Sequence, residues 1–411
     1  MSVCSTFLPR LLYIGDVPVE SSYHGSALLF RLLQGWPSER LRIIEANLVR
    51  SLPERRLPGI QYEGLQVGNP RLLHTRFARW YGAWLMRTDG RVGQVARLLR
   101  DFRPEVVLTV THGFSWLAAA RFAAQHELPL HLICHDDLPR TPLLPNWVHP
   151  WLDREFGCVY RQAVSRLCVS PFMCEAYRER YGAEGTVLYP SRAANCPSFS
   201  ASPERISRSD HPFTMAFGGT INSPGYVNAL VKMASTLALI GGRLFIFGPI
   251  TPQAARQAGL ERPNIVLRGL VKSSDFMTRL REEADALFVP MSFAAADRPN
   301  MEISFPSKLT DYTAVGLPLL IYGPDYCSAV RWARENAGVA EIVTSEKGEE
   351  TSAAVRRLLR NDHRRLLASR ALEVGNRFFK HEVAERVLFA ALENHHLEQV
   401  RADLRAQSVA S

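Results

Sequence analysis

The clearest structural pattern in the chain lies in residues 284–323, which read ADALFVPMSFAAADRPNMEISFPSKLTDYTAVGLPLLIYG. The apolar run at 286–290 is short and ends at a proline, as expected for a strand that is buried on both faces of a sheet. A polar loop, a helical segment at 306–315 and a second apolar run at 318–323 follow it. A strand, a helix and a second strand in this order predict a parallel sheet.

The same alternation of short apolar runs and helical segments continues on both sides of this stretch. The sequence therefore predicts an α/β fold with two Rossmann-like, doubly wound parallel sheets that face each other across a cleft. The predicted strands are 11–15, 41–46, 106–110, 130–134, 166–170, 186–189, 213–218, 243–248, 265–269, 286–290, 318–323 and 340–344. The predicted helices between them are 24–35, 71–87, 91–102, 114–126, 171–181, 224–240, 251–259, 273–284, 306–315 and 325–336.

A Ser- and Pro-rich segment between the two halves has few large aliphatic residues and is typical of a linker. We predict an N-terminal Rossmann-like domain over 1–190, a linker over 191–212 and a C-terminal Rossmann-like domain over 213–385. A final helix is predicted over 386–411. The length of 411 residues suits two domains of similar size.

The chain is basic, with 49 Lys and Arg against 40 Asp and Glu, a net charge of +9 that favours anionic partners. Seven cysteines without a C-x-x-C pair predict free thiols rather than a zinc site or a disulfide framework. The N-terminus does not resemble a signal peptide, and no apolar stretch of about 18 residues predicts a membrane span. We expect a cytoplasmic protein, located at the inner face of the cell membrane if it binds lipid.

Three common motifs are missing. No G-x-G-x-x-G follows an early strand, and the chain contains neither a G-x-x-x-x-G-K-[ST] loop nor a G-x-S-x-G elbow. These absences argue against a nicotinamide-dependent dehydrogenase, a P-loop hydrolase and an α/β-hydrolase.

Two places in the first half combine a strand end with polar or glycine residues. A loop runs from Gly15 to a helix start at His24 and Gly25, where backbone N–H groups favour a phosphate or an acceptor hydroxyl. His135 and Asp136 follow another strand and predict a polar clamp or a proton-transfer pair, and His112 occupies the equivalent place after the preceding strand. The alternatives are a plain connecting loop and a turn in which an Asp caps a short helix.

The segment 304–316 predicts an anion site. Ser304 is expected to cap its helix and Pro306 to occupy the first turn, which puts Lys308 near the positive end of the helix dipole. A lysine gains nothing from the dipole there, so a bound anion explains it better. Asp311 lies one turn further on the same face and suits ribose hydroxyls. The alternative is an exposed Lys–Asp pair.

These motifs resemble those of glycosyltransferase family 4, the "group 1" transferases of the GT-B fold. The similarity is carried by ADALFVP, by FPSKLTDYTAVGLP, by Gly218-Gly219, and by the FGP, RGLV and NRFF segments at 247–249, 268–271 and 376–379. In that family the C-terminal domain binds a nucleotide sugar, the N-terminal domain binds the acceptor, and transfer retains the anomeric configuration. The family usually needs no metal, and the resemblance implies that the final helix, here 386–411, crosses back to the N-terminal domain.

The resemblance also assigns residues. Asp311 takes the place of the second glutamate of the family's E-x7-E pair, whereas the first falls at Ile303, with Glu302 next to it. No Arg and Lys pair follows Gly219. We therefore predict as catalytic residues His135, Asp136, Glu302 and Lys308, as donor-binding residues Gly218, Gly219, Lys272, Arg298, Ser307 and Asp311, and as acceptor-side residues Gly15, His24, Gly25 and His112. No metal or cofactor is expected.

An amphipathic helix is predicted over 74–87. Phe77, Trp80, Tyr81 and Trp84 recur at helical spacing on one side, with arginines beside them. This pattern is typical of a helix on an anionic membrane, or of an aromatic face that packs into the domain core.

We thus expect a retaining glycosyltransferase that acts on a saccharide or lipid-linked acceptor, in cell-surface polysaccharide or glycolipid assembly. The alternatives are a non-catalytic GT-B protein that binds a nucleotide or scaffolds other enzymes, and a GT-B sugar epimerase. No nucleic-acid-binding motif is present.

Overall fold

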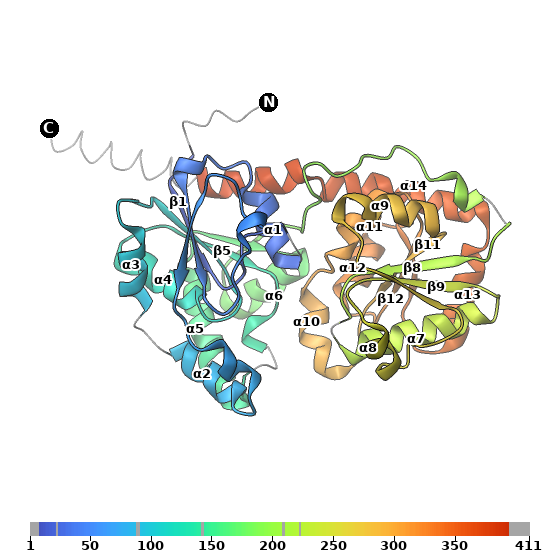
Figure 1. The fold of residues 1–411 in the computed structure, drawn as a ribbon, viewed down its shortest axis with the longest axis horizontal. Helices are drawn as coiled ribbons and strands as arrows, with labels where there is room; N and C mark the ends of the chain where they lie inside the picture. Colours follow the sequence, from blue (N-terminus) through green and yellow to red (C-terminus); the bar gives the residue numbers. More distant parts are fainter. Residues whose placement is uncertain are drawn as a thin grey trace. The chain divides into compact units, whose positions relative to one another are not determined.

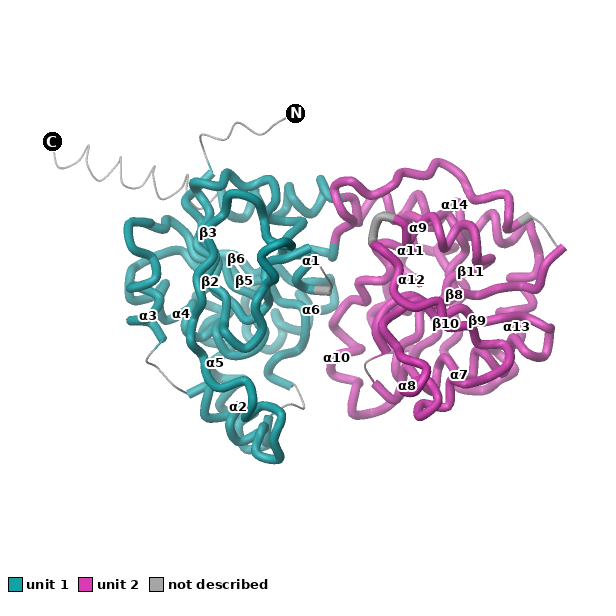
Figure 2. The backbone as a smooth tube through the Cα atoms, viewed as in Figure 1, with its two compact units in different colours: residues 1–190, 381–411 teal, residues 191–380 magenta. Residues whose placement is uncertain are grey.

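The computed structural model describes residues 8–21, 24–87, 91–140, 144–207, 210–221 and 223–393. The chain divides into two compact units (Figure 2). Unit 1 comprises Met1–Pro190 and His381–Ser411, and unit 2 comprises Ser191–Lys380. Each unit has its own sheet, so each is described separately.

The sheet of unit 1 has seven strands in the order β3-β2-β1-β4-β5-β6-β7, and all neighbouring pairs are parallel. Its helices lie around this sheet (Figure 1). The strands are β1 (Leu11–Gly15), β2 (Leu41–Ala46), β3 (Gln61–Leu65), β4 (Val106–Val110), β5 (Leu130–Cys134), β6 (Ser165–Cys168) and β7 (Thr186–Val187). The helices are α1 (His24–Leu33), α2 (Ala78–Arg87), α3 (Arg91–Leu99), α4 (Trp116–Gln125), α5 (His149–Gln162) and α6 (Pro171–Tyr181).

The core of unit 1 forms between β1, β4 and the helices that cover them. All five residues of β1 and of β4 are buried, which agrees with the apolar runs that predicted these strands. Residues 381–393 are helical and pack into the same core. There the ring of Phe389 meets that of Trp36 edge to face, with centroids 5.0 Å apart.

The sheet of unit 2 has six strands in the order β10-β9-β8-β11-β12-β13, again all parallel. The strands are β8 (Thr214–Gly218), β9 (Arg243–Phe247), β10 (Ile265–Gly269), β11 (Ala286–Pro290), β12 (Leu319–Tyr322) and β13 (Ala340–Val343). The helices are α7 (Pro224–Ala238), α8 (Pro252–Gln257), α9 (Ser273–Glu283), α10 (Arg298–Ile303), α11 (Lys308–Val315), α12 (Ser328–Glu335), α13 (Gly348–Leu358) and α14 (Asn361–Phe378).

Two parallel, doubly wound sheets confirm the predicted α/β fold class. The strand order reverses between β1 and β4 in unit 1, and between β8 and β11 in unit 2. Open α/β sheets bind ligands beyond the carboxyl ends of the strands at such reversals. Each unit therefore offers one such place.

Two elements of unit 1 escaped prediction, and the predicted helix 71–87 is shorter than expected. Strand β3 has the sequence QYEGL, in which only Leu65 is buried, so its pattern lacks an apolar run. Helix α5 contains Pro150 in its first turn, where proline is tolerated, and Gly157 in its interior. In the predicted helix, residues Pro70–His74 form a short 3-10 turn and α2 begins only at Ala78.

Within the described residues, no helix combines the length and the apolar character that crossing a bilayer requires.

Candidate functional site

The candidate site of unit 2 starts from glycines at the carboxyl end of β8. Gly219 has φ +129°, a conformation that favours glycine, and its N–H donates to the carbonyl of Phe247 at 2.8 Å. A Cβ on Gly219 would lie 2.8 Å from Cε of Lys308, and one on Gly248 would lie 2.4 Å from the carbonyl oxygen of Gly219. Side chains have no room here, so the backbone itself faces the space beside Lys308.

Lys308 brings a cation to these glycines. Its ammonium lies 5.2 Å from the ring centroid of Phe217 and 5.5 Å from that of Tyr226, within reach of cation–π attraction. Among the described residues no carboxylate pairs with it, and burial lowers the pKa of Lys308 to about 8. A partly buried cation without a counter-ion can bind an anion, because the anion would restore the charge balance that burial removes.

Two helices begin beside this lysine, and a third packs against Gly218. The N–H of Tyr226 in the first turn of α7 donates to Oγ of Ser223, and a Cβ on Gly225 would lie 2.0 Å from Oγ of Ser292 after β11. Helix α9 contributes Phe276, whose ring would lie 2.3 Å from a Cβ on Gly218. Helix α11 begins at Lys308 itself. The positive ends of helix dipoles therefore gather where the lysine lies.

The start of α11 differs in detail from the sequence prediction. Ser307, not Ser304, precedes the first helical residue; it is exposed, and its side chain makes no capping hydrogen bond. The expectation for Ser304 is wrong because its hydroxyl donates to Oδ1 of Asn300 at 2.6 Å. Pro306 lies before the cap rather than in the first turn. Lys308 is nevertheless at the helix start.

The rest of α11 is held by hydrogen bonds to Gly218 and to Arg192, which lies near the start of unit 2. The hydroxyl of Tyr312 accepts the N–H of Gly218 at 2.6 Å. Arg192 donates to the carbonyl of Thr310 at 3.0 Å and to Oγ1 of Thr313 at 3.2 Å. Burial lowers the pKa of Arg192, while the nearby carboxylate of Asp311 raises it. Asp311 is partly buried and close enough to Arg192 to affect its charge.

The other predicted donor-side residues are not brought to Lys308 by any contact among the described residues. Arg298 and Glu302 form an ion pair with each other on α10 at 3.7 Å, and Arg298 lies over the ring of Tyr326. Lys272 is exposed at the N-terminus of α9, four residues before Phe276.

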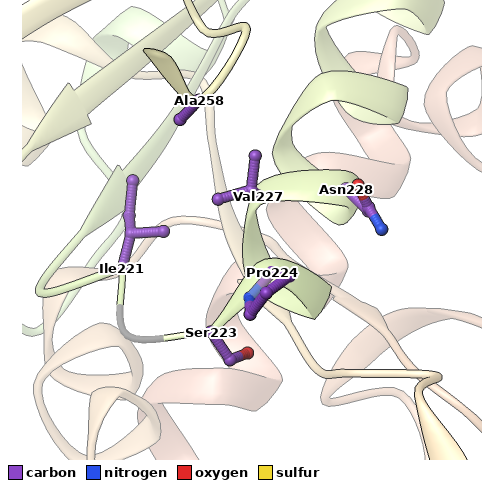
Figure 3. Close-up of a pocket in the computed structure, with 6 residues that line it drawn as sticks. All are labelled: Ile221, Ser223, Pro224, Val227, Asn228 and Ala258. Carbon is purple, nitrogen blue, oxygen red and sulfur yellow. The ribbon is translucent and has the colours of Figure 1, made fainter. Parts of the chain in front are cut away.

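A groove opens beside the first turn of α7 (Figure 3). Its volume of about 400 Å³ is large enough for a sugar- or base-sized group. Ile221, Val227 and Ala258 give it an apolar wall, and the polar side chains of Ser223 and Asn228 lie at its margin (Figure 3). Asn222, which the sequence places in the same loop, is outside the described residues.

The candidate site of unit 1 consists of residues that directly follow β1, β4 and β5, which are neighbours in the sheet. Oδ2 of Asp16, the residue after Gly15, accepts the N–H groups of Phe114 and Ser115 at 2.8 and 2.5 Å. A Cβ on Gly113 would lie 2.6 Å from Cγ of Asp16. Oδ1 of Asp16 is buried and has no hydrogen-bond partner among the described residues.

His135 lies at the same edge. Burial lowers its pKa to about 4, Asp136 opposes this shift, and His112 adds to it. Nε2 of His135 is buried without a hydrogen-bond partner in the described part of the chain. The neighbouring Asp137 is held by Arg180 through both carboxylate oxygens at 2.9 Å, so this residue serves the fold.

Three of the predicted acceptor-side residues, His112, His24 and Gly25, lie in the loops after β4 and β1 or at the start of α1. His112 is exposed and close enough to His135 to affect its charge. Helix α1 begins at His24, whose side chain lies outside what the structure describes, and a Cβ on Gly25 would lie 3.3 Å from Cγ1 of Val17.

Sequence reasoning missed Asp16, Phe217, Tyr226 and Tyr312. Asp16 directly follows a predicted strand, and that position is a usable signal for a polar residue at the sheet edge. The three aromatic residues gave no signal, because a single aromatic in a buried strand or helix is ordinary core.

Comparisons with known proteins give a family match for part of the chain and fold matches for almost all of it. Residues 54–191 match the family model described as Glycosyltransferase Family 4. Among solved structures, HepE from Anabaena in complex with UDP is 14% identical, with a TM-score of 0.66 over 93% of this chain and 99% of that one. Sucrose-phosphate synthase from Thermosynechococcus elongatus is 13% identical, with a TM-score of 0.65 over 97% and 99%.

WaaG, a glycosyltransferase involved in lipopolysaccharide biosynthesis, is 12% identical, with a TM-score of 0.61 over 93% of this chain and 99% of that one. A comparison with curated protein sequences finds no significant match. These structural similarities extend over almost the whole chain, and they show that it has the predicted GT-B fold.

Proposed function

We propose, from the premise that residues 54–191 form a glycosyltransferase family 4 domain in a chain with the GT-B fold, that this protein moves a sugar from a nucleoside-diphosphate sugar to a saccharide or lipid-linked acceptor. The anomeric configuration is retained. The donor is a uridine diphosphate (UDP) sugar, a choice supported by HepE, whose structures contain UDP and UDP-glucose.

The unpaired Lys308 carries this proposal. When the glycosidic bond of the donor breaks, its electron pair moves onto the diphosphate, and an oxocarbenium-like carbon is left behind. Lys308 and the starts of α7 and α11 offer positive charge and N–H groups to the diphosphate. A cation without a counter-ion suits this role, because the negative charge on the diphosphate increases as the glycosidic bond breaks.

The remaining donor contacts follow from this placement. Gly218 and Gly219 allow the diphosphate to approach the backbone, and Asp311, one turn after Lys308, takes the ribose hydroxyls. Lys272, Arg298, Ser307 and Glu302 are assigned to the donor as well, on the family resemblance alone.

The cluster in unit 1 is assigned to the acceptor. His135 stays neutral at pH 7 because burial lowers its pKa to about 4. A neutral imidazole can donate one hydrogen bond and accept another, so His135 suits a sugar hydroxyl better than a phosphate. Asp136 and His112 are close enough to His135 to affect its charge, and Gly15 and Asp16 lie at the end of β1 on the same edge of the sheet.

We further propose that the reaction belongs to cell-surface polysaccharide or glycolipid assembly in the cytoplasm. The similarity to WaaG, which takes part in lipopolysaccharide biosynthesis, supports this assignment.

A turnover assay with a panel of UDP-sugars tests the proposal. Lys308→Ala should lower nucleotide release by about 10²–10³-fold, the usual effect of removing one group that stabilises developing charge. Lys232→Ala is the matched control, because Lys232 lies on α7 in the same unit and pairs with Glu346. Equal rates for wild type and Lys308→Ala would refute the assignment, and UDP binding without turnover of any sugar would identify a non-catalytic protein.

A further inference from the structure

We propose that unit 1 docks on an anionic lipid membrane through a surface built from the segment 71–87 and Trp147. This inference is independent of the sugar chemistry, since it uses no residue of either candidate site. We call this region the aromatic–arginine surface. It consists of Leu72, Phe77, Trp80, Trp84 and Trp147 with Arg71, Arg76, Arg79 and Arg87.

The aromatic side chains of this surface face outward. Phe77, Trp80, Trp84 and Trp147 are 58%, 61%, 57% and 51% exposed. Trp147 comes from a different segment than the others, yet its ring lies 5.6 Å from that of Trp80. Large apolar side chains that gather in this way on a surface mark a place of interaction.

The fold holds this orientation firmly. The opposite side of α2 buries Gly82, Ala83, Leu85 and Met86. Arg79 donates to the carbonyl of Leu144 at 2.8 Å. Because small and aliphatic residues fill the inner face, the alternative in which the aromatic side packs into the core is wrong for Phe77, Trp80 and Trp84.

A second hydrogen bond helps to hold α2 in place: the hydroxyl of Tyr81 accepts the N–H of Asn69 at 2.7 Å. Tyr81 is partly buried, unlike its three aromatic neighbours. In Figure 1, α2 lies at one end of unit 1, below the sheet. The exposed rings therefore project from an end of the unit and are not part of its core.

The two segments that carry the rings contain arginines and no acidic residues. Residues 64–88 and 138–152 contain five arginines, at 71, 76, 79, 87 and 140, and no Asp or Glu. The guanidinium of Arg76 lies 4.8 Å from the ring centroid of Phe77, and that of Arg87 lies 5.7 Å from that of Trp147. Cations and aromatic rings are thus presented together.

An anionic bilayer matches these features better than a protein partner does. Tryptophan prefers the headgroup level of a membrane, where its ring enters the apolar layer and its N–H stays hydrated. Arginines beside it can reach lipid phosphates, and two segments without a single carboxylate avoid repulsion from an anionic surface. More than half of each ring is exposed, so the rings can enter the apolar layer of a bilayer.

Vesicle binding tests the inference with the full-length protein. Wild type should co-sediment with vesicles of phosphatidylcholine containing 30% phosphatidylglycerol, at least tenfold more strongly than with pure phosphatidylcholine. Binding should weaken at least tenfold at about 0.5 M salt, where charge interactions are screened. Tryptophan fluorescence should shift to the blue on binding, because Trp36, Trp116 and Trp332 are already buried and Trp80, Trp84 and Trp147 are not.

Two double variants locate the binding. Trp80→Ser/Trp84→Ser and Arg71→Gln/Arg76→Gln should each reduce binding at least fivefold without changing the unfolding temperature, because all four side chains are exposed. The matched controls in unit 2 are Leu239→Ser/Leu366→Ser and Arg256→Gln/Arg262→Gln, which remove equally exposed side chains.

Several outcomes would overturn the inference. These are no vesicle binding, equal binding to both lipid mixtures, binding that the two variants leave intact, and self-association or capture of a protein through the same surface. Release of nucleotide from a UDP-sugar without vesicles is measured separately, so failure here leaves the proposed function standing.

Discussion

At the scale of single residues, His135 shows how burial sets the chemistry of a side chain. The pKa of His135 is about 4, against an ordinary value of 6.5 that applies in the unfolded chain. Between these two pH values the unfolded chain binds more protons than the folded one. The stability that His135 contributes is therefore complete above about pH 6.5 and is lost as the pH falls toward 4.

We predict that His135→Gln loses less stability than wild type when the pH is lowered from 7.5 to 5.0. Urea unfolding at both pH values measures this difference. The ring ¹⁵N shifts of His135 give a second measurement: they should stay those of a neutral imidazole down to pH 5, and titration of this ring near pH 6.5 would contradict the account.

Lys308 predicts a different dependence on pH. Its pKa of about 8 means that the free protein loses this cation as the pH rises through 8. UDP should therefore bind about tenfold more weakly at pH 9 than at pH 7, since one pKa unit corresponds to a tenfold change in the charged fraction. Lys308→Arg keeps its charge over this range and should flatten the profile. A wild-type affinity that is constant from pH 7 to 9.5 would contradict this prediction.

The sequence located Lys308 and His135 but not the groups that tune them. Lys308 was found because a lysine at a helix start is poorly placed unless an anion is present. Phe217 and Tyr226 reach it from a strand and a helix more than eighty residues earlier in the chain, which is a matter of tertiary packing. Asp16 likewise meets its partners Phe114 and Ser115 only because β1 and β4 are adjacent.

At the scale of elements, the turn after β8 decides whether α11 can present its lysine. Gly219→Ala adds a Cβ that would lie 2.8 Å from Cε of Lys308, at a φ of +129°. We predict that this variant loses UDP affinity at least tenfold as well as stability.

Gly259→Ala is the matched control for that variant. Gly259 also has a positive φ, +71°, but a Cβ there would meet nothing within 4 Å. It should cost about 1 kcal/mol of stability from backbone strain and leave UDP binding unchanged. Equal affinities for the two variants would show that Gly219 has no role beside Lys308.

Arg192 links the start of unit 2 to α11 and α14. Besides its bonds to α11, Nη1 donates to Oδ1 of Asn376 at 2.6 Å, and its N–H donates to the carbonyl of Phe379 at 2.9 Å. Arg192→Met removes three side-chain hydrogen bonds of a buried cation and should lower the free energy of unfolding of unit 2 by about 2–4 kcal/mol. Chemical denaturation measures this change.

The control for Arg192 is Arg360→Met. Arg360 is exposed and pairs with Asp362, so its removal should change stability by less than about 0.5 kcal/mol. If Arg192→Met were as mild as this control, the link between the linker and α11 would contribute nothing to the fold.

The elements themselves were largely predictable, and the exceptions have physical reasons. Buried parallel strands such as β1 and β4 are recognised in the sequence as apolar runs. Strand β3 lies at the edge of its sheet and is only partly buried, so it has no such run. The cap of α11 was assigned to Ser304 because its residue type suits a cap. Its hydroxyl, at the end of α10, instead donates to the side chain of Asn300. The sequence did not predict α10.

At the scale of the whole molecule, the two units should respond differently to the donor. Lys308 and its neighbours all belong to unit 2. We predict that UDP slows hydrogen exchange in the amides of 218–228 and 306–315, while β2 and β3 of unit 1 remain unchanged. Protection confined to unit 1 would contradict the assignment of the donor to unit 2.

The family was predicted from motifs in the C-terminal half, whereas the family model matches residues 54–191. The two lines of evidence are therefore independent. The motif in 284–323 can be recognised in the sequence because its turns and its helix start require particular residue types. The first half has fewer such positions, so its similarity is one of architecture and of patterns spread over many residues.

Calorimetric titration with UDP is the strongest test of whether a nucleoside diphosphate binds in unit 2 against Lys308. We predict saturable binding to wild type at pH 7, at least tenfold weaker binding to Lys308→Met, and unchanged binding to Lys232→Met, because Lys232 pairs with Glu346. Binding of equal strength to Lys308→Met and wild type, or no binding of UDP to either, would contradict this prediction.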